Sequence, residues 1–522
     1  MIEGTNLIGV SGSKESDEFL QAYDPSENRT LPEKFYIASE EEVDRALEKA
    51  KDAFKTYSRI SGKKKADFLD AIAEEILALG DTLIKRASAE SGLPNGRFEG
   101  ERGRTVNQIR MFAELLREGS WVDARIDTAK PDRKPIPKAD IRNMLFPMGP
   151  VVVFGASNFP LAFSTAGGDT ASALAAGCPV VVKAHESHPG TNELVSRAIL
   201  KAAEKTGMPD GVFSSLNGKA ETGQKLVQHP YTKAIGFTGS LKGGSAIYRA
   251  AAEREEPIPV YAEMGSINPV FLLNEKLQTS AEELAETYSQ SVTLGKGQFC
   301  TKPGLIIGQK GEALDRFSKT LAEKLTEYSP GCMLNPGIME NYRGRREEII
   351  SQEGVHTLKA ADDESSLNGA SALASVDATA FLKNKKLSEE VFGPFTLIVE
   401  CENESQILEV ATKLEGQLTV TLMGNNDELK KQEELVHICH EKAGRIIFNG
   451  VPTGVEVCHS MQHGGPWPAT SDSKFTSVGT GAIRRFVRPV AYQDFPEELL
   501  PDELKPGNPL NIFRIVDGNY QK

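Results

Sequence analysis

Hydrophobic and polar residues along the amino-terminal part of the chain predict a short β region followed by helices. Up to about residue 37, short apolar runs are interrupted by turn formers such as Asp24 and Pro25. From Ser39, acidic residues and apolar residues at helical spacing predict a capped helix. The same periodicity predicts further helices over residues 66–79 and about 101–116.

The middle of the chain alternates compact apolar runs with helical patterns. We expect helices over residues 161–176 and 192–206, and strands at residues 151–154, 178–183, 212–216 and 234–237. Strands that alternate with helices form a parallel sheet with crossover connections. This part of the chain therefore predicts a Rossmann-type cofactor domain.

After Glu263 the alternation resumes and predicts a second α/β unit. Its expected elements are helices over 280–294, 312–328 and 404–414, and strands at 305–307, within 391–399 and at 418–423. Residues 127–142 and the tail from 484 are rich in proline and lack periodicity, which indicates extended segments. The expected fold class is α/β: a Rossmann-type parallel-sheet cofactor domain, an α/β catalytic domain and a small arm.

Composition narrows the class of protein. The 522 residues, 39% hydrophobic and 25% charged, are typical of a globular protein of two or three domains, and the net charge of −13 argues against a nucleic-acid or anionic-membrane partner. The six cysteines lack CxxC pairs or zinc-ligand spacing, so we expect a reducing compartment and no metal. With no signal peptide or membrane-length apolar run, we expect a cytoplasmic protein.

Three stretches carry residue types that suit covalent acyl chemistry. Residues 295–301 place Cys300 behind two glycines, which permit close backbone approach to a ligand, and a thiolate is a strong nucleophile. Glu263 ends an apolar strand and can act as a general base for water. Asn158 follows another strand and offers an amide donor to an oxyanion. A cysteine is more often a buried small hydrophobe, but these companions favour a nucleophile.

These stretches resemble the aldehyde dehydrogenase superfamily, in the same order and from about residue 23 to about residue 495. The resemblance implies that Cys300 adds to an aldehyde while the amide of Asn158 and the backbone amide of Cys300 stabilise the oxyanion. Glu263 would then activate water to hydrolyse the thioester, which argues against a relative that passes the acyl group to coenzyme A. A catalytically silent structural relative is the alternative, and the presence of these residues speaks against it.

The cofactor prediction rests on a glycine-rich turn and on the resemblance. No GxGxxG is present, but Gly239, Ser240 and Gly244 open a helix after a strand, and exposed amides at a helix start favour a pyrophosphate. The resemblance further assigns the adenosine ribose to Lys183 and Glu186, and the nicotinamide side to Glu390 and Phe392. A carboxylate at Glu186 favours NAD over NADP, although Lys183 and Lys219 leave NADP open.

The substrate prediction comes from residues 452–470, which include Thr453. This stretch resembles the branch that holds 2,5-dioxopentanoate (α-ketoglutarate semialdehyde) dehydrogenases together with enzymes for long-chain aldehydes. Arg104 falls where the family helix faces the substrate tunnel and could bind a carboxylate, with Phe159 and Phe163 as an apolar wall. The alternative for Arg104 is a structural ion pair with Glu101 or a loop carboxylate. We expect oxidation of this semialdehyde to 2-oxoglutarate, with a long-chain aldehyde as the rival substrate.

The resemblance also suggests a domain division and an oligomer. Residues 1–128 and 151–262 would form the NAD(P)-binding domain, and residues 263–465 the catalytic domain. Residues 129–150 and 484–522 would form an arm that joins copies of the chain in a homodimer or a dimer of dimers.

Overall fold

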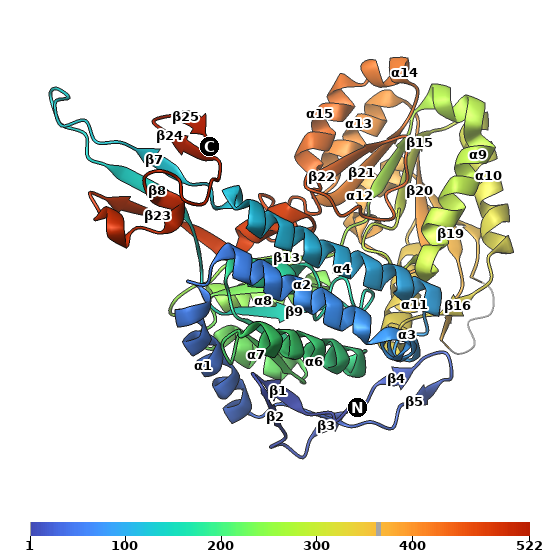
Figure 1. The fold of residues 1–522 in the computed structure, drawn as a ribbon. Helices are drawn as coiled ribbons and strands as arrows, with labels where there is room; N and C mark the ends of the chain where they lie inside the picture. Colours follow the sequence, from blue (N-terminus) through green and yellow to red (C-terminus); the bar gives the residue numbers. More distant parts are fainter. Residues whose placement is uncertain (1, 362–366) are drawn as a thin grey trace.

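The computed structural model describes residues 2–361 and 367–522. In this part of the chain, two seven-stranded sheets with helices on both faces make up the body, and a five-stranded sheet projects from it (Figure 1). The structure confirms the α/β fold class. None of the helices in the described residues combines the length and the apolar character that would let it cross a membrane.

The first sheet has the strand order β13-β12-β9-β10-β11-β1-β2. The strands from β13 to β11 in this order are parallel. Strands β1 and β2 are antiparallel and complete the other edge. Their bounds are β1 (Asn6–Ile8), β2 (Ser11–Ser13), β9 (Val151–Phe154), β10 (Val180–Lys183), β11 (Phe213–Leu216), β12 (Ala234–Thr238) and β13 (Val260–Glu263). The apolar runs of the sequence thus mark the strands of the cofactor-type sheet correctly.

Each parallel strand of this sheet is buried on both faces because its alternate side chains enter different cores. Val151 and Val153 lie in one core, and Val152 and Phe154 lie in the other. The first core is covered by α2 (Gly62–Ala78), α3 (Gly80–Ala89), α4 (Asn95–Glu118), α5 (Gly168–Ala176) and α6 (Pro189–Thr206). The second is covered by α1 (Glu40–Tyr57), α7 (Ala220–Gln228) and α8 (Leu241–Ala252).

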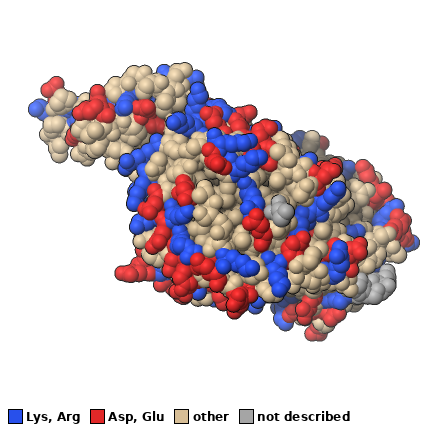
Figure 2. Space-filling model, turned by 60° about the horizontal axis from the view of Figure 1, so that its bottom comes forward, with Lys and Arg blue, Asp and Glu red and all other residues tan. Residues whose placement is uncertain are grey.

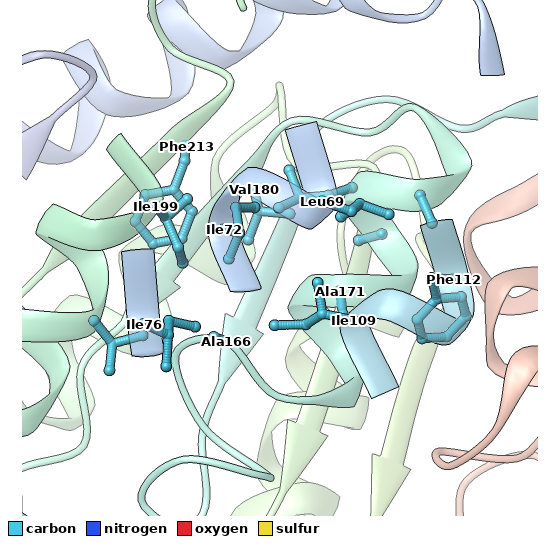
Figure 3. Close-up of a cluster of buried hydrophobic side chains, with 14 of the residues drawn as sticks. Leu69, Ile72, Ile76, Ile109, Phe112, Ala166, Ala171, Val180, Ile199 and Phe213 are labelled. Atoms are coloured by element: carbon cyan, nitrogen blue, oxygen red, sulfur yellow. The ribbon is translucent and has the colours of Figure 1, made fainter. Parts of the chain in front are cut away.

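Figure 3 shows how the first core is assembled from sequence-distant elements. Ile72 of α2 lies beside Val180 of the sheet, and Ile109 of α4 lies beside Ala171 of α5. Ile199 of α6 and Phe213 of β11 close the same cluster. Helix α4, which carries Arg104, is thereby fixed on the body of the molecule.

The second sheet has the order β17-β19-β20-β15-β14-β21-β22, with only the edge strand β17 antiparallel within the described residues. Its strands are β14 (Pro269–Leu272), β15 (Leu305–Gln309), β17 (Val355–Lys359), β19 (Ala372–Asp377), β20 (Phe395–Cys401), β21 (Gln417–Met423) and β22 (Ala443–Phe448). The surrounding helices are α9 (Asn274–Thr293), α10 (Glu312–Glu327), α11 (Pro336–Ile350), α12 (Ala378–Lys383), α13 (Glu404–Lys413), α14 (Asn426–Lys430) and α15 (Glu433–Lys442).

The projecting sheet has the order β23-β8-β7-β24-β25. It consists of β7 (Arg125–Asp127), β8 (Ile141–Pro147), β23 (Val487–Gln493), β24 (Arg514–Val516) and β25 (Asn519–Gln521). Strand β8 pairs with β23 from Pro147 opposite Val487 to Ile141 opposite Gln493, so the proline-rich segment and the tail share one sheet. We call this sheet, together with the loops that join its strands, the arm.

The remaining strands form short two-stranded ribbons: β3 (Phe19–Leu20) with β6 (Phe35–Tyr36), β4 (Tyr23–Asp24) with β5 (Arg29–Thr30), and β16 (Gly331–Cys332) with β18 (Asn368–Gly369). Basic and acidic side chains are interspersed over the face of the molecule in Figure 2. This face therefore has no large basic patch.

Two expected elements are corrected by the structure. The helix expected over 161–176 begins only at Gly168, because the carbonyl of Phe163 accepts from the amide of Ala156 at 2.8 Å and the amide of Gly167 donates to the carbonyl of Ser164 at 2.8 Å, which is a turn and not a helix. The strand expected within 391–399 begins at Phe395, and the residues before it form a loop. Both corrected segments border the candidate site.

Candidate active site

The site forms where the carboxyl ends of the first sheet meet the amino ends of the second. Strands β9, β10, β12 and β13 are parallel, so the residues that follow them emerge at one sheet edge. Facing them are the loops that precede β15 and β20 and carry Cys300 and Glu390. The side-chain amide of Asn158 crosses the gap and donates to the carbonyl of Gln298 at 3.0 Å. The topology therefore brings Asn158, Glu263 and Cys300 together.

The loop before Cys300 has an unusual backbone that requires glycine. Gly295, Lys296 and Gly297 have φ values of 56°, 61° and 66°, in the left-handed region that disfavours side chains with a Cβ. A Cβ at Gly297 would lie 2.3 Å from the carbonyl carbon of Gly393. The two loops of the second sheet can approach each other this closely only because position 297 has no side chain.

A buried amide holds the cysteine loop against the turn that follows Glu263. The Nδ2 of Asn268 donates to the carbonyls of Cys300 at 2.9 Å and Lys302 at 3.0 Å. Its Oδ1 accepts from the hydroxyls of Ser266 and Thr419, both at 3.0 Å. Because every polar atom of this side chain is used, the distance between the two loops is fixed.

Cys300, His463 and Glu263 form a contiguous chain of ionisable groups. The Nε2 of His463 lies 3.6 Å from the Sγ of Cys300 and 2.8 Å from Oε1 of Glu263. The hydroxyl of Ser477 donates to the other carboxylate oxygen at 2.6 Å. His463 and Glu263 are almost fully buried, whereas Cys300 is partly exposed. A small cavity of about 20 Å³ beside this group is large enough for one water molecule.

The surroundings shift the pKa values of Glu263 and Cys300 in opposite directions. Burial alone would raise the pKa of Glu263, but His463 and Ser477 outweigh it and hold this pKa below its ordinary value. Burial raises the pKa of the Cys300 thiol well above its usual range, and the negative charge of Glu263 adds to this effect. The resting site therefore pairs a carboxylate base with a protonated thiol.

The predicted substrate side is an aromatic wall with a buried arginine. Phe159 contacts Phe163 and Phe299, with ring centroids 5.4 and 5.2 Å apart. The guanidinium of Arg104 lies 5.0 Å from the centroid of the Phe163 ring. Burial lowers the pKa of Arg104, and the negative charges of Glu101 and Glu263 oppose this shift.

Arg104 has no hydrogen-bonding partner for either Nη atom in the residues that the structure describes, although both atoms are buried. The alternative partner expected from the sequence, Glu101, is engaged elsewhere. It forms a salt bridge of 2.7 Å with Arg97 and accepts two backbone amides. A buried cation whose donors are unused is ready to receive an anionic ligand. The hydroxyl of Thr453 contacts the hydroxyl of Ser291.

The expected cofactor residues lie along the same sheet edge. Lys183 and Glu186 follow β10 and are 3.4 Å apart, and Glu186 is about half exposed. Gly239 and Ser240 are exposed at the start of α8, where Ser240 caps the helix. A Cβ at Gly244 would lie 2.6 Å from Met264, so the first turn of α8 packs directly on the strand end beside Glu263.

On the opposite side, the carboxylate of Glu390 lies against the turn after β13. The contact is so close that a Cβ at Gly265 would be 2.6 Å from Oε2 of Glu390. Burial raises the pKa of Glu390 to about 7, although the charge of Lys302 opposes this shift. Lys302 donates to the carbonyls of Val391 at 3.0 Å and Phe395 at 2.8 Å, which fixes the loop that carries Glu390 and Phe392. These features fit a dinucleotide: amides at the start of α8, a carboxylate at Glu186 for ribose hydroxyls, and the loop that carries Glu390 and Phe392.

Four functional side chains were missed from the sequence: His463, Ser477, Asn268 and Lys302. His463 lies within the stretch 452–470 that distinguishes the branch, so its position next to two glycines was a usable signal. Ser477 and Asn268 act through contacts with residues far away in the sequence. A hydroxyl or amide in a loop gives no sequence signal of such a contact.

Comparison with known proteins assigns the class. The chain belongs to the aldehyde dehydrogenase family, whose family model matches residues 12–467. It is an oxidoreductase that oxidises aldehydes with NAD(P). Two relatives are especially similar along their whole length. "Alpha-ketoglutaric semialdehyde dehydrogenase 2" of Azospirillum brasilense is 50% identical over 523 residues, which cover 100% of both chains. "Alpha-ketoglutaric semialdehyde dehydrogenase" of Acinetobacter baylyi is 48% identical over 93% of this chain and 92% of its own.

Solved structures with the same fold are more distant in sequence. Betaine aldehyde dehydrogenase from Staphylococcus aureus superposes with a TM-score of 0.80 at 18% identity, covering 95% of this chain and 96% of its own. 1-Pyrroline-5-carboxylate dehydrogenase from Thermus, solved with bound NAD, gives 0.77 at 22% identity, covering 94% and 92%. These similarities support the fold.

Proposed function

We propose that this enzyme oxidises α-ketoglutarate semialdehyde (2,5-dioxopentanoate) to 2-oxoglutarate. The observation that carries the proposal is Arg104, a buried guanidinium beside Phe163 whose Nη atoms have no partner in the described chain. The carboxylate of the semialdehyde supplies the charge that this cation lacks. The two relatives at 50% and 48% identity are named for the same substrate.

The rival substrate, a long-chain aldehyde, leaves this charge unmatched. Truncating or mismatching a buried, hydrogen-bonded charge pair costs about 2–5 kcal/mol. The aromatic wall of Phe159, Phe163 and Phe299 can contact the carbon chain of either substrate. Arg104 is therefore the feature that discriminates between the two.

Catalysis starts at Cys300. As Sγ bonds to the aldehyde carbon, the thiol proton passes to the His463–Glu263 pair, whose Nε2 lies 3.6 Å from Sγ. The amide of Asn158 and the backbone amide of Cys300 donate to the developing oxyanion, and one such donor contributes about 3 kcal/mol. When bound, NAD(P) accepts the hydride that leaves this carbon, and a thioester on Cys300 remains.

Glu263 performs the second half of the reaction. After the thiol proton has left the pair to solvent, the carboxylate of Glu263, held ionised by His463 and Ser477, removes a proton from the water that attacks the thioester carbon. The C–S bond then breaks, the acid is released and Cys300 recovers its proton. This assignment makes Cys300 the nucleophile, Glu263 the base and His463 the residue that sets the charge of the base.

The cofactor residues follow from the same geometry. We propose that the amide of Ser240 and the first turn through Gly244 receive the pyrophosphate, while Gly239, whose amide donates to the carbonyl of Glu263 at 3.0 Å, shapes the turn. Lys183 and Glu186 would hold the adenosine ribose, and Glu390 and Phe392 the nicotinamide side. The exposed carboxylate of Glu186 repels a 2′-phosphate, so NAD is preferred. Glu186→Thr should raise the ratio of kcat/KM for NADP to that for NAD, and a wild-type preference for NADP would contradict the assignment.

We further propose the domain division expected from the sequence: a cofactor domain of residues 1–128 and 151–262, a catalytic domain of residues 263–465, and an oligomerisation segment of residues 129–150 and 484–522. The structure differs at β7 (Arg125–Asp127), which pairs with β8 and β24 and so belongs to the arm. The arm would join copies of the chain in a dimer or a dimer of dimers. Its exposed apolar side chains, among them Ile136, Leu499, Phe513 and Tyr520, support this role.

The substrate is tested by comparing kcat/KM of the wild-type enzyme for 2,5-dioxopentanoate and for a long alkanal such as decanal. We expect the semialdehyde to be preferred by about 30-fold or more, the value of roughly 2 kcal/mol of charge pairing. Cys300→Ala provides the zero-activity control. A preference for decanal would contradict the substrate, and residual turnover of Cys300→Ala would contradict the nucleophile.

A further inference from the structure

The ionisable chain at the active site has a second chemical property. The side chains of Glu263, Cys300 and His463 each present one donor atom, and these atoms lie within 4.8 Å of one another. Carboxylate oxygen, thiolate sulfur and imidazole nitrogen are the ligand types that Zn²⁺ prefers. We propose that these three residues form an inhibitory site for Zn²⁺ and similar borderline-soft divalent cations, which compete with catalysis by binding the nucleophile.

The sulfur–nitrogen separation matches that of a tetrahedral ion, whereas the carboxylate has to shift to join it. With Zn–S near 2.3 Å and Zn–N near 2.05 Å, a tetrahedral site requires about 3.6 Å between sulfur and nitrogen. The distance between Sγ of Cys300 and Nε2 of His463 is 3.6 Å. A nitrogen–oxygen edge requires about 3.4 Å, whereas His463 Nε2 and Glu263 Oε1 are 2.8 Å apart. The carboxylate must therefore withdraw by roughly half an ångström as the ion replaces the hydrogen bond.

The charges balance when the ion binds. The cation displaces the thiol proton, so that a sulfur–metal bond forms, an S–H bond breaks and one proton leaves to solvent. The dication then meets one thiolate, one carboxylate and a neutral imidazole, and the complex has no net charge. Because one proton leaves as the dication enters, the charge of the site rises from −1 to zero, and the guanidinium of Arg104 loses one neighbouring negative charge.

The residues around the site determine how a metal ion reaches it and how tightly the ion is held. Cys300 is partly exposed, so an ion can enter by the path of the substrate and keep water as its fourth ligand. Metal-bound histidines in structural sites usually donate their second ring nitrogen to an acceptor. The Nδ1 of His463 is buried and has no partner among the residues described here. We therefore expect a reversible site that a chelator empties, and not a permanent structural metal.

The sequence could not indicate this site. The three ligands lie at positions 263, 300 and 463, far from the short spacings that mark zinc motifs, and the sequence predicted no metal. The site exists only because the loop with His463 folds back onto the end of β13, where Thr470 forms a β-bridge with Glu263.

The test is the binding of Co²⁺ to the full-length enzyme, which needs no catalysis to be observed. A cobalt–thiolate bond gives a near-ultraviolet charge-transfer band, and titration of the wild-type protein should show this band with one Co²⁺ per chain. Cys300→Ala should abolish the band, and His463→Phe should raise the Co²⁺ concentration for half-saturation by at least about tenfold. Cys458→Ser, which alters another partly exposed cysteine, is the matched control and should keep the band.

Inhibition links the site to function. Zn²⁺ should inhibit the wild-type enzyme and the Cys458→Ser variant alike, and EDTA should restore the activity of both. A charge-transfer band of full intensity in Cys300→Ala, or its loss in Cys458→Ser, would place the metal elsewhere and overturn the proposal. Absence of any band in the wild-type protein would overturn it as well, without affecting the proposed substrate.

Discussion

Glu263 and Cys300 are two acids that share one neighbour, His463, yet their pKa values move in opposite directions. The carboxylate is stabilised by the imidazole and by the hydroxyl of Ser477, which lower its pKa. The thiol faces that same carboxylate, and burial together with this negative charge raises the pKa of Cys300. A base that is ionised beside a nucleophile that is protonated can accept the proton when the substrate arrives.

The first prediction concerns the pH dependence that His463 controls. His463→Phe removes the main interactions that lower the pKa of Glu263 and leaves only weaker ones such as the Ser477 hydrogen bond, so burial raises this pKa. Because the base works only when it is deprotonated, activity is lost as pH falls through this pKa. The acidic limb of the kcat profile should therefore move to higher pH.

His463→Gln is the matched control for this prediction, since a glutamine amide can still donate a hydrogen bond to Glu263. Its acidic limb should lie between those of the wild-type enzyme and His463→Phe. Acidic limbs at the same pH in all three proteins would mean that His463 does not set the charge of Glu263.

At the scale of single residues, the sequence predicted the groups whose role depends on their own chemistry. Cys300, Glu263 and Asn158 each follow a recognisable strand or glycine pattern, and parallel topology then places them at one edge. His463 and Ser477 were missed because their roles depend on a loop that returns to β13 from some 200 residues away. No local pattern encodes that return.

At the scale of elements, the cysteine loop and the loop before β20 are held together by the absence of a side chain at position 297. Gly297→Ala introduces a Cβ at a φ of 66° and within 2.3 Å of Gly393. Backbone strain of this kind costs about 1–3 kcal/mol before the steric clash is added. The variant should unfold at a lower temperature and lose most of its activity, as measured by calorimetry and steady-state kinetics.

Gly100→Ala is the matched control, because Gly100 lies in α4 with open space around its Cβ position. Alanine favours a helix over glycine by up to about 1 kcal/mol, so this variant should be as stable as the wild-type protein or more stable. Equal thermal stability and activity for both variants would contradict the close loop contact.

Apolar runs predicted the parallel strands of the first sheet and β15, β20 and β21 of the second, because buried parallel strands are hydrophobic on both faces. The helix expected over 161–176 was wrong in its first part because the carbonyl of Phe163 accepts from the amide of Ala156, at the end of the preceding strand, and the amide of Gly167 donates to the carbonyl of Ser164. These turn bonds replace the helical ones. The turn that results carries Phe163 to Arg104 and His463.

At the scale of the whole molecule, the arm exposes apolar side chains that a partner copy would cover. Tyr520 on the edge strand β25 is 82% exposed, and this arm projects from the body in Figure 1. Tyr520→Asp places a charge in the proposed contact and should lower the average molar mass in light scattering at micromolar concentration. Val10→Asp alters a residue of similar exposure, 68%, outside the arm and should leave the mass unchanged. Equal masses for both variants and the wild-type chain would contradict assembly through this edge.

The most direct test of the proposed function is the effect of Arg104→Met on kcat/KM for two aldehydes, 2,5-dioxopentanoate and the neutral pentanal. We expect kcat/KM to fall about 30- to 700-fold for the semialdehyde, roughly 2–4 kcal/mol, and to be unchanged for pentanal. Arg102→Met, on the same helix but hydrogen-bonded to the carbonyl of Gly80, should change neither value strongly. An equal loss on both aldehydes in Arg104→Met would show that Arg104 only supports the helix and would contradict recognition of the substrate carboxylate.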